Sequence, residues 1–313
     1  MLVEAPSGIQ IEEIVSATAF QELRPEWENL WRRCLRATPF QSPHWLLPWW
    51  KHFGGSGLWC LAVRAGGELV GLVPCFIWDR KLLLIGTGIT DYLDALIDPE
   101  WEAISMAAIM PLLTQQSHHW DQCDFQQLRA NSSLCGTDAA VQDVCPVLDL
   151  STPDVPMLKK AAYYLRHAAN FGTVRIEAAA EQNFERCFSE FLRLHQLRWK
   201  NEAVLKEADL KTFHYEVAFQ FLRLAALRLY VLYLDRRAIA AWYGFESHRR
   251  VYYYLGGFDP AFEKLSPGAI LIAHAIRQAR EHGAREFDFL RGQERYKYSW
   301  GAHDTFTYRR QSV

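Results

Sequence analysis

A weak internal repeat constrains the fold of this 313-residue sequence more than any other feature. Judged by the period of its apolar residues, each half contains two helices, a hairpin, a strand, a further helix and a last strand. The elements predicted in the first half are helices over 27–35 and from Pro43, a hairpin of 59–64 and 69–78, a strand at 81–85, a helix over 101–116 and a strand over 122–128. Those predicted in the second half are helices over 183–199 and near 209–226, a hairpin of 229–234 and 239–246, a strand at 251–255, a helix over 267–282 and a strand over 286–290.

Supersecondary units that recur in one order indicate a duplication. The sequence therefore predicts an α/β (α+β) chain of two tandem lobes, each a mixed, mostly antiparallel sheet flanked by helices. A proline-marked linker at 149–156 separates the halves, so we expect domains at 1–150 and 157–313. Chance alignment of short apolar strands is the alternative to a duplication.

Charge is distributed unevenly between the two halves. Residues 1–156 carry 9 Lys and Arg against 19 Asp and Glu, a balance of −10, whereas residues 157–313 carry 25 against 17, a balance of +8. This asymmetry indicates either an anionic ligand on the second half or mutual attraction between the halves. Both interpretations stay open at this point.

Composition and targeting signals favour a cytoplasmic globular protein. Half of the residues are apolar and 22% are charged, which excludes a disordered, collagen-like or coiled-coil chain. The longest apolar stretch, Leu69–Trp78, is far shorter than the roughly 20 residues that a membrane span needs. The N-terminus has acids where an export signal has lysines, and the seven scattered cysteines include no C-x-x-C pair. We therefore expect free thiols, no metal site and no membrane span.

Several common catalytic motifs are absent from the sequence. It contains no phosphate-binding P-loop, no G-x-S-x-G and no H-E-x-x-H, and Gly86-Thr87-Gly88 lacks the third glycine of a dinucleotide site. Aromatic residues of the first half alternate with acids as often as with bases, which argues against a DNA-binding face there. His195 lies on an apolar helical stripe, where a core histidine is favoured over a catalytic one.

The segment 251–301 contains the most specific candidate site. A strand ends in Gly256-Gly257, and a helix starts at Ser266-Pro267, with Ser266 as N-cap and Pro267 as first helical residue. Free N–H groups and the positive end of the helix dipole favour an anion at such a helix start, and Lys264 adds a charge. An ordinary capped helix is the alternative interpretation.

Two strings of this segment resemble the GNAT acyltransferase superfamily: YYYLGGFDPAFEKLSPG at 252–268 and EFDFLRGQERYKYSWGA at 286–302. The resemblance is to the CelD-like branch associated with cellulose and exopolysaccharide loci, which is similar to the Fem aminoacyltransferases with their duplicated lobes. It extends over nearly the whole chain. The other matching segments are Phe40-Gln41-Ser42-Pro43, Trp49-Trp50, Gly86 to Asp94, Leu194-His195 and Arg198-Trp199.

The resemblance implies acetyl-CoA, or another acyl-CoA, as co-substrate. In that family the donor lies along the strand before the central helix, and a Q/R-x-x-G-x-G/A loop holds its pyrophosphate. The matching loop here is 263–269, where Glu263 replaces the first residue, Ser266 replaces a glycine and Pro267 removes one N–H donor. The implied cofactor-binding residues are Leu255, Gly256, Gly257, Lys264, Leu265, Ser266, Gly268 and Ala269.

The expected activity is transfer of an acyl group, acetyl above all, to an amine or sugar hydroxyl of a small molecule or glycan precursor. The candidate catalytic residues, each of which has a surface or ion-pair role as its alternative, are Asp288, Arg291, Glu294, Tyr296 and Lys297. Lys297 lies in a Y-K-Y-S-W-G context like that of an active-site lysine in the Fem relatives, so it is expected to stabilise an oxyanion or hold a phosphate. A lysine that covers aromatic surface is the alternative.

The first lobe is expected to be non-catalytic, because the equivalent loop at 86–100 carries four acids that would repel a pyrophosphate. Two other functions remain open. One is a Fem-like transferase that takes its acyl group from aminoacyl-tRNA. The other is a non-catalytic subunit of a polysaccharide-synthesis complex, in which Trp45, Trp49 and Trp50 stack on sugars or on a partner, although core packing explains them equally well.

Overall fold

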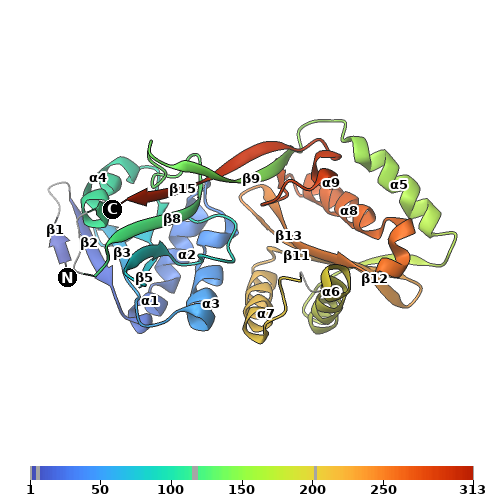
Figure 1. Cartoon of the computed structure of the whole chain (residues 1–313), viewed down its shortest axis with the longest axis horizontal. Coiled ribbons are helices and arrows are strands. Elements are labelled where there is room, and N and C mark those ends of the chain that lie inside the picture. Colours follow the sequence, from blue (N-terminus) through green and yellow to red (C-terminus); the bar gives the residue numbers. More distant parts are fainter. Residues whose placement is uncertain (1, 5–7, 115–118, 201–202, 313) are drawn as a thin grey trace. The chain divides into compact units, whose positions relative to one another are not determined.

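The computed structural model describes residues 2–4, 8–114, 119–200 and 203–312, and the chain divides into two compact units (Figure 1). The first unit is Met1–Asp143 with Phe306–Val313, and the second is Val144–Thr305. Two strands, β9 (Ala140–Asp149) and β15 (His303–Ser312), each begin in one unit and end in the other. The lobes expected at 1–150 and 157–313 stay a prediction of where the duplicated halves divide.

The first unit contains two groups of strands. Its elements are β1 (Leu2–Glu4), β2 (Ile9–Ile14), α1 (Ala17–Glu22), α2 (Arg24–Arg33), the 3-10 turn η1 (Pro39–Gln41), α3 (Pro43–Phe53), β3 (Cys60–Ala65), β4 (Glu68–Val73), β5 (Cys75–Trp78), β6 (Lys81–Leu84), β7 (Leu96–Ile97), α4 (Glu102–Thr114) and β8 (Gln122–Arg129). Strands β1, β2, β3, β4 and β7 form an antiparallel sheet, whereas β5 and β6 are antiparallel and β6 and β8 are parallel. The predicted end of the helix, at 115–116, lies outside the described residues.

The tryptophans of the first unit are mostly core residues. Trp27 and Trp45 are fully buried, and Trp49 is buried as well. The indole of Trp27 donates to the carbonyl of Gln41 at 2.9 Å, and that of Trp45 donates to the Thr90 hydroxyl at 2.9 Å. Because these rings are internal, a sugar or partner could reach only the half-buried Trp50 among the three predicted stacking residues.

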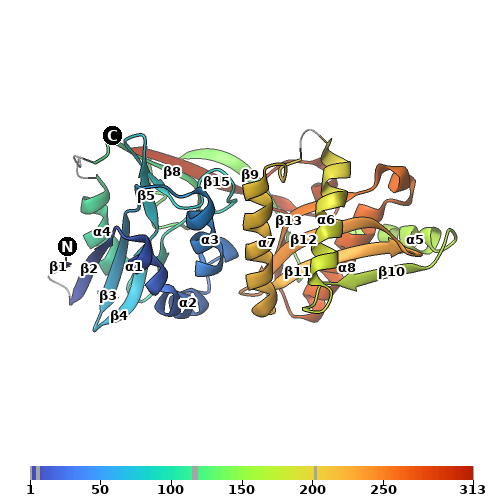
Figure 2. The ribbon, with the colours of Figure 1, turned by 90° about the horizontal axis from the view of Figure 1, so that it is seen from below.

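The second unit is a mostly antiparallel sheet covered by helices on both faces. Its elements are α5 (Pro156–Ala168), β10 (Val174–Ala178), α6 (Phe184–Trp199), α7 (Ala208–Arg223), β11 (Leu227–Leu234), β12 (Arg237–Ser247), β13 (Arg250–Phe258), the 3-10 turn η3 (Pro260–Leu265), α8 (Pro267–Glu281), β14 (Glu286–Asp288) and α9 (Arg295–Tyr298). The strand order is β10-β11-β12-β13-β14-β9, and β13 and β14 are the parallel pair. Figure 2 shows α6 and α7 across one face of β11–β13.

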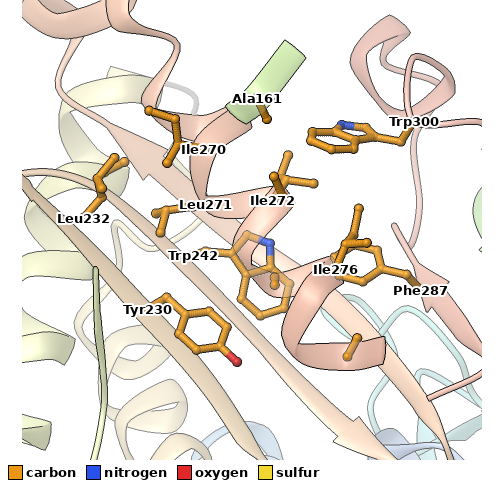
Figure 3. Packing of buried hydrophobic residues seen from close by; sticks show 14 of the residues in the cluster. Ala161, Tyr230, Leu232, Trp242, Ile270, Leu271, Ile272, Ile276, Phe287 and Trp300 are labelled. Carbon is orange, nitrogen blue, oxygen red and sulfur yellow. The ribbon is translucent and has the colours of Figure 1, made fainter. Parts of the chain in front are cut away.

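Adjacent residues of β12 point to opposite faces of this sheet, as the period of a strand requires. Trp242 packs with Ile272 of α8 and with Phe287 in the main core of the unit (Figure 3). Its neighbour Tyr243 packs against Phe191 of α6, with the ring centroids 5.0 Å apart. The sheet therefore has α8 on one face and α6 on the other.

The predicted repeat is confirmed by the order of the elements in the two units. The β3–β4 hairpin corresponds to β11–β12, β6 to β13, α4 to α8 and β8 to β14. The corresponding strands form parallel pairs in both units: β6 with β8 in the first and β13 with β14 in the second. Strand β14 ends at Asp288 rather than at the predicted Leu290, because Leu290 has a left-handed backbone, with φ of 56°.

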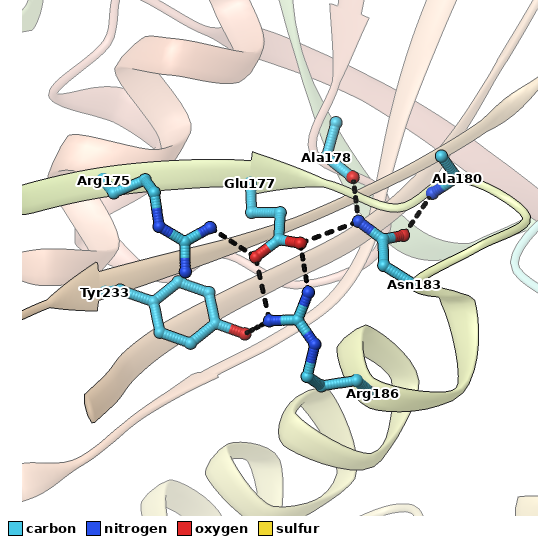
Figure 4. A network of polar contacts seen from close by, with 7 residues as sticks. All are labelled: Arg175, Glu177, Ala178, Ala180, Asn183, Arg186 and Tyr233. Carbon is cyan, nitrogen blue, oxygen red and sulfur yellow. Dashed lines mark hydrogen bonds and ion pairs between the residues drawn. The ribbon is translucent and has the colours of Figure 1, made fainter. Parts of the chain in front are cut away.

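A network of charged groups joins β10 to the start of α6 (Figure 4). The carboxylate of Glu177 accepts hydrogen bonds from Arg186, Arg175 and Asn183, the last at 2.8 Å. The guanidinium of Arg175 also lies 4.2 Å from the centre of the Tyr233 ring. Hydrogen bonding to Arg186, in the first place, lowers the pKa of Glu177 to about 2. This carboxylate is therefore ionised in the folded protein at neutral pH.

Among the described helices, none combines the length and the apolar character that crossing a bilayer would require.

Candidate active site

A cavity of about 350 Å³ lies in the second unit between β13 and the first turns of α8. The outer part of β13 forms one wall, and residues 266–269 with Leu271 and Ile272 form another. The end of α6 contributes Arg198 and Trp199, and the segment after β14 contributes Tyr296 and residues 299–300. Glycines and apolar side chains predominate in the lining, with a few polar groups, as in most small-molecule sites.

The cavity opens because β13 continues after its pairing with β14 has ended. The last matched pair of the parallel ladder is Tyr252 with Asp288, while β13 runs on to Phe258 beside β12. An extra residue, Tyr254, interrupts the β12–β13 register between Tyr243 and Gly244 and forms a β-bulge. The outer edge of β13 beyond Tyr252 thus presents backbone groups that no described strand pairs.

The start of α8 differs from the predicted cap. Ser266 is the N-cap residue and Pro267 the first helical residue, as expected, but the Ser266 side chain makes no capping hydrogen bond. Its backbone is left-handed, with φ of 51°, whereas a capping side chain normally requires an extended backbone. A Cβ added at Gly268 would meet one carbon of Phe258, at 3.9 Å, so the space beside this turn is open.

The end of α6 holds the strand that lines the cavity. His195 Nδ1 and Trp199 Nε1 each lie 3.0 Å from the carbonyl oxygen of Gly256. A Cβ at Gly257 would come within 2.4 Å of the His195 backbone nitrogen, so helix and strand pack backbone to backbone. The guanidinium of Arg198 lies 5.1 Å from the Trp199 ring and 4.9 Å from the Phe258 ring.

Two tyrosines supply hydroxyl groups at the cavity. The hydroxyls of Tyr253 and Tyr296 are hydrogen-bonded to each other, and burial raises the pKa of the Tyr253 phenol. A Cβ at Gly256 would come within 2.4 Å of the Tyr253 hydroxyl, which explains the glycine at that position. The Tyr253 phenol therefore remains protonated at neutral pH and can donate a hydrogen bond.

Lys297 is buried, and its ammonium group contacts its own loop. Nζ donates to the carbonyls of Leu290 at 3.2 Å, Arg291 at 2.6 Å and Gly292 at 3.1 Å, and it lies 2.9 Å from the carboxylate of Glu294. Each of its three N–H groups thus has a carbonyl partner. This geometry supports a role in shaping the loop, and the expected oxyanion role stays a prediction.

The structure brings part of the predicted set together. Tyr296 is the one candidate catalytic residue that lines the cavity; Asp288 is buried and accepts a hydrogen bond from the Leu290 amide at 2.9 Å. The predicted binding residues that line the cavity are Gly256, Gly257, Ser266, Gly268 and Ala269. Those that do not are Leu255, Lys264 and Leu265. The lining residues that sequence reasoning assigned no role at the site include Met157, Arg198, Trp199, Trp242, Tyr253 and Ser299.

The described residues contain no group of three or more His, Cys, Asp or Glu side chains that could hold a metal ion.

Comparison with known proteins finds a family model that matches the part of the chain around this site. Residues 157–298 match the acetyltransferase (GNAT) domain family, whereas no curated protein matches the sequence. The fold resembles the C-terminal domain of a putative lysylphosphatidylglycerol synthetase from Agrobacterium fabrum, with a TM-score of 0.64, 12% identity and coverage of 94% of this chain and 91% of that one. FemX is similar over 95% of this chain and 96% of its own, with a TM-score of 0.61 and 10% identity.

A third structure, L-PGS from Bacillus licheniformis, covers 87% of this chain and 91% of its own, with a TM-score of 0.58 and 10% identity. At such identities these structures establish a shared fold and no more. The matched segment contains β13, the start of α8 and almost all of the cavity lining. Residues 157–298 of this chain are therefore similar to the acetyltransferase (GNAT) domain family, and the cavity lies almost wholly within the matched segment.

Proposed function

We propose that the protein is an acyl-CoA-dependent acyltransferase that moves an acyl group, acetyl in the first place, to an amine or a sugar hydroxyl. The observation that carries this proposal is the cavity between the unpaired edge of β13 and the start of α8, inside the matched domain. From the resemblance of the sequence we further propose a cytoplasmic enzyme of the CelD-like branch, with a small molecule or glycan precursor of the cell envelope as acceptor.

The residues around the cavity fit an acyl-CoA donor. Gly256 and Gly257 carry no side chain, so an extended ligand can approach the backbone of β13 closely. The first turn of α8 lacks a side-chain cap and has open space at Gly268, which suits a pyrophosphate at the positive end of the helix dipole. The Arg198 guanidinium lies at the same cavity and adds positive charge.

The donor, when bound, supplies an activated acyl group as a thioester. We assign roles in direct attack on this thioester to several groups at or near the cavity. Within Leu255–Gly257, the backbone N–H of Gly256, which points away from β12 to the open edge of β13, is our candidate for polarising the acyl carbonyl. The hydrogen-bonded hydroxyls of Tyr253 and Tyr296 are candidates for giving a proton to the departing thiolate. The other candidate residues would act indirectly, by holding the loop that places Tyr296; they are Asp288, Arg291, Glu294 and Lys297.

A ligand panel tests the proposal. We expect coenzyme A and acetyl-CoA to raise the melting temperature, since a ligand at 100 times its Kd stabilises the folded state by about 2.7 kcal/mol. Gly268→Asp places a carboxylate beside the α8 start, where the open space allows folding, and should abolish the shift. Gly55→Asp is the matched control, because a Cβ at Gly55 also meets nothing within 4 Å, and it should respond like the wild type.

The same panel separates the alternatives. Stabilisation by tRNA, weakened steeply by salt and without any response to coenzyme A, would replace the proposal with a Fem-like aminoacyl-tRNA transferase. Stabilisation by neither ligand would refute the proposal and leave the non-catalytic subunit. Longer acyl-CoAs in the panel compare acyl chain lengths.

A further inference from the structure

We propose that His195 is a positioning residue of this site: together with Trp199 it holds the carbonyl of Gly256 and so fixes the open edge of β13 for the acyl donor. This inference rests on the proposed function. It starts from the two donors that converge on one carbonyl oxygen, each at 3.0 Å. Because His195 and Trp199 are four residues apart on α6, both side chains emerge from the same face of the helix.

The Gly256 carbonyl faces the side of β13 on which β14 has ended. The Asp259 amide donates to the carbonyl of Ile239 on β12 at 2.9 Å, and Gly257 is matched with Ala241 in the same ladder. Since backbone groups of successive residues alternate between the two edges of a strand, those of Gly256 point away from β12. On that open edge the side chains of α6 take the place of a neighbouring strand.

The imidazole of His195 is in the state that this contact needs. A carbonyl can only accept, so Nδ1 must carry the hydrogen and Nε2 the lone pair. Nε2 is buried and has no hydrogen-bond partner among the described residues, and burial lowers the pKa of the ring, so the ring is neutral. Burying an imidazole is less favourable than burying a leucine on the same apolar stripe, and the Gly256 bond is the polar contact that offsets this difference.

Loss of the hydrogen bond from His195 to the Gly256 carbonyl would affect a segment of the cavity wall whose backbone is weakly constrained. Gly256 and Gly257 have wide backbone freedom, and the β-bulge at Tyr254 has already interrupted the ladder beside them. At Gly257 the strand lies against the α6 backbone, which fixes its distance from the helix but not the rotation of the Gly256 peptide. The side chains of His195 and Trp199 fix that rotation.

The test compares three variants for acetyl-CoA affinity, measured by calorimetry, and for hydrogen exchange over 253–258. His195→Leu removes the donor and should weaken acetyl-CoA binding about tenfold, with faster exchange in the unliganded protein. His195→Asn places an amide N–H near the position of Nδ1 and should restore the affinity to within about threefold of the wild type. His274→Leu is the control, since it removes a half-buried imidazole of α8 whose ring packs on Tyr230.

The outcomes separate this inference from the proposed function. If the wild type binds acetyl-CoA and His195→Leu binds it equally well, the positioning role is refuted and the acyltransferase proposal stands. Equal weakening in the Asn and Leu variants would also refute it, because a merely structural histidine is not rescued by an amide donor. If the wild type does not bind acetyl-CoA, both proposals fail. Should His195→Leu not fold, His195→Phe keeps an aromatic ring, removes the donor and carries the same expectation.

Discussion

Replacing Lys297 with methionine tests whether this lysine acts on the loop or on the substrate. The substitution keeps most of the length of the side chain and removes the ammonium group. It leaves the carbonyls of Leu290, Arg291 and Gly292 without their donor, in a place where Lys297 itself is 2% exposed. The paired Glu294 carboxylate is 48% exposed, so water can solvate it and its loss of a partner contributes little.

The expected cost follows from the three lost carbonyl contacts. A hydrogen bond to a charged group contributes roughly 1.5–3 kcal/mol, and a buried acceptor left without its donor costs about 1–3 kcal/mol. We take about 3–5 kcal/mol for Lys297→Met. For a unit of this size, 1 kcal/mol corresponds to a shift of about 2–4 °C, so the melting temperature of the second unit should fall by roughly 6–20 °C.

Calorimetry of Lys297→Met against Lys159→Met provides the measurement. Lys159 is an exposed lysine of the same unit, with 89% of its side chain accessible, and its replacement should leave the melting temperature within about 1 °C. A Lys297→Met protein that melts like the wild type but has lost turnover by about 10²–10³ would refute the structural assignment and favour the oxyanion role.

Three further predictions follow from the second unit. The pKa of Glu177 is lowered in the folded state, so its contribution to stability is complete above pH 4.5 and is lost as the pH falls toward 2; Glu177→Gln should flatten the melting temperature across that range. Gly257→Ala forces a Cβ within 2.4 Å of the α6 backbone and should destabilise the fold by about 1–3 kcal/mol in urea unfolding, an expectation that an unchanged midpoint would contradict. A fragment of residues 144–305 should give a dispersed NMR spectrum, and one of 157–313 should not, because the latter lacks the stretch of β9 that pairs with β14.

The order of helices and strands could be predicted from the sequence because it depends on local apolar periodicity. The stripes that predicted α6 and α8, and the hairpins in both halves, are visible within windows of ten to fifteen residues. The division into units could not be found in this way. It depends on β15, whose residues Thr307 and Tyr308 pair with β8, nearly two hundred residues earlier in the chain. Pairing at such a separation has no signal in local sequence.

For the candidate site, too, local sequence predicts backbone features better than side-chain contacts. The glycines of β13 and the start of α8 were found because backbone constraints are visible in residue type. Lys297 was identified by its context, but the sequence does not say whether an ammonium group points to a ligand or to its own loop. The apolar stripe favours a core position for His195, which is buried, whereas its bond to the Gly256 carbonyl is evident only from the structure. The one available signal was the spacing of His195 and Trp199.

Under the proposed function we expect the duplicated plan to give one acyl-donor site, not two, because the equivalent edge of the first unit is filled by its own chain. There the parallel pair β6–β8 ends at Leu82 and Cys123, and the loop that follows returns to β8, with the Leu93 amide donating to the carbonyl of Gln127 at 3.0 Å. The side-chain amide of Gln41 donates to the carbonyl of Tyr92 at 3.1 Å and ties the same loop to η1.

A cavity of about 40 Å³ lies beside this loop in the first unit, which is room for little more than water. It is lined in part by Asp94, whose pKa is raised to about 6 by burial and whose carboxyl group accepts a hydrogen bond from the Ser132 hydroxyl at 2.6 Å. Calorimetric titration with acetyl-CoA should therefore give one binding site per chain, lost in Gly268→Asp. A stoichiometry of two, or one site that survives Gly268→Asp, would mean that the first unit binds the donor and that its closed loop opens to admit it.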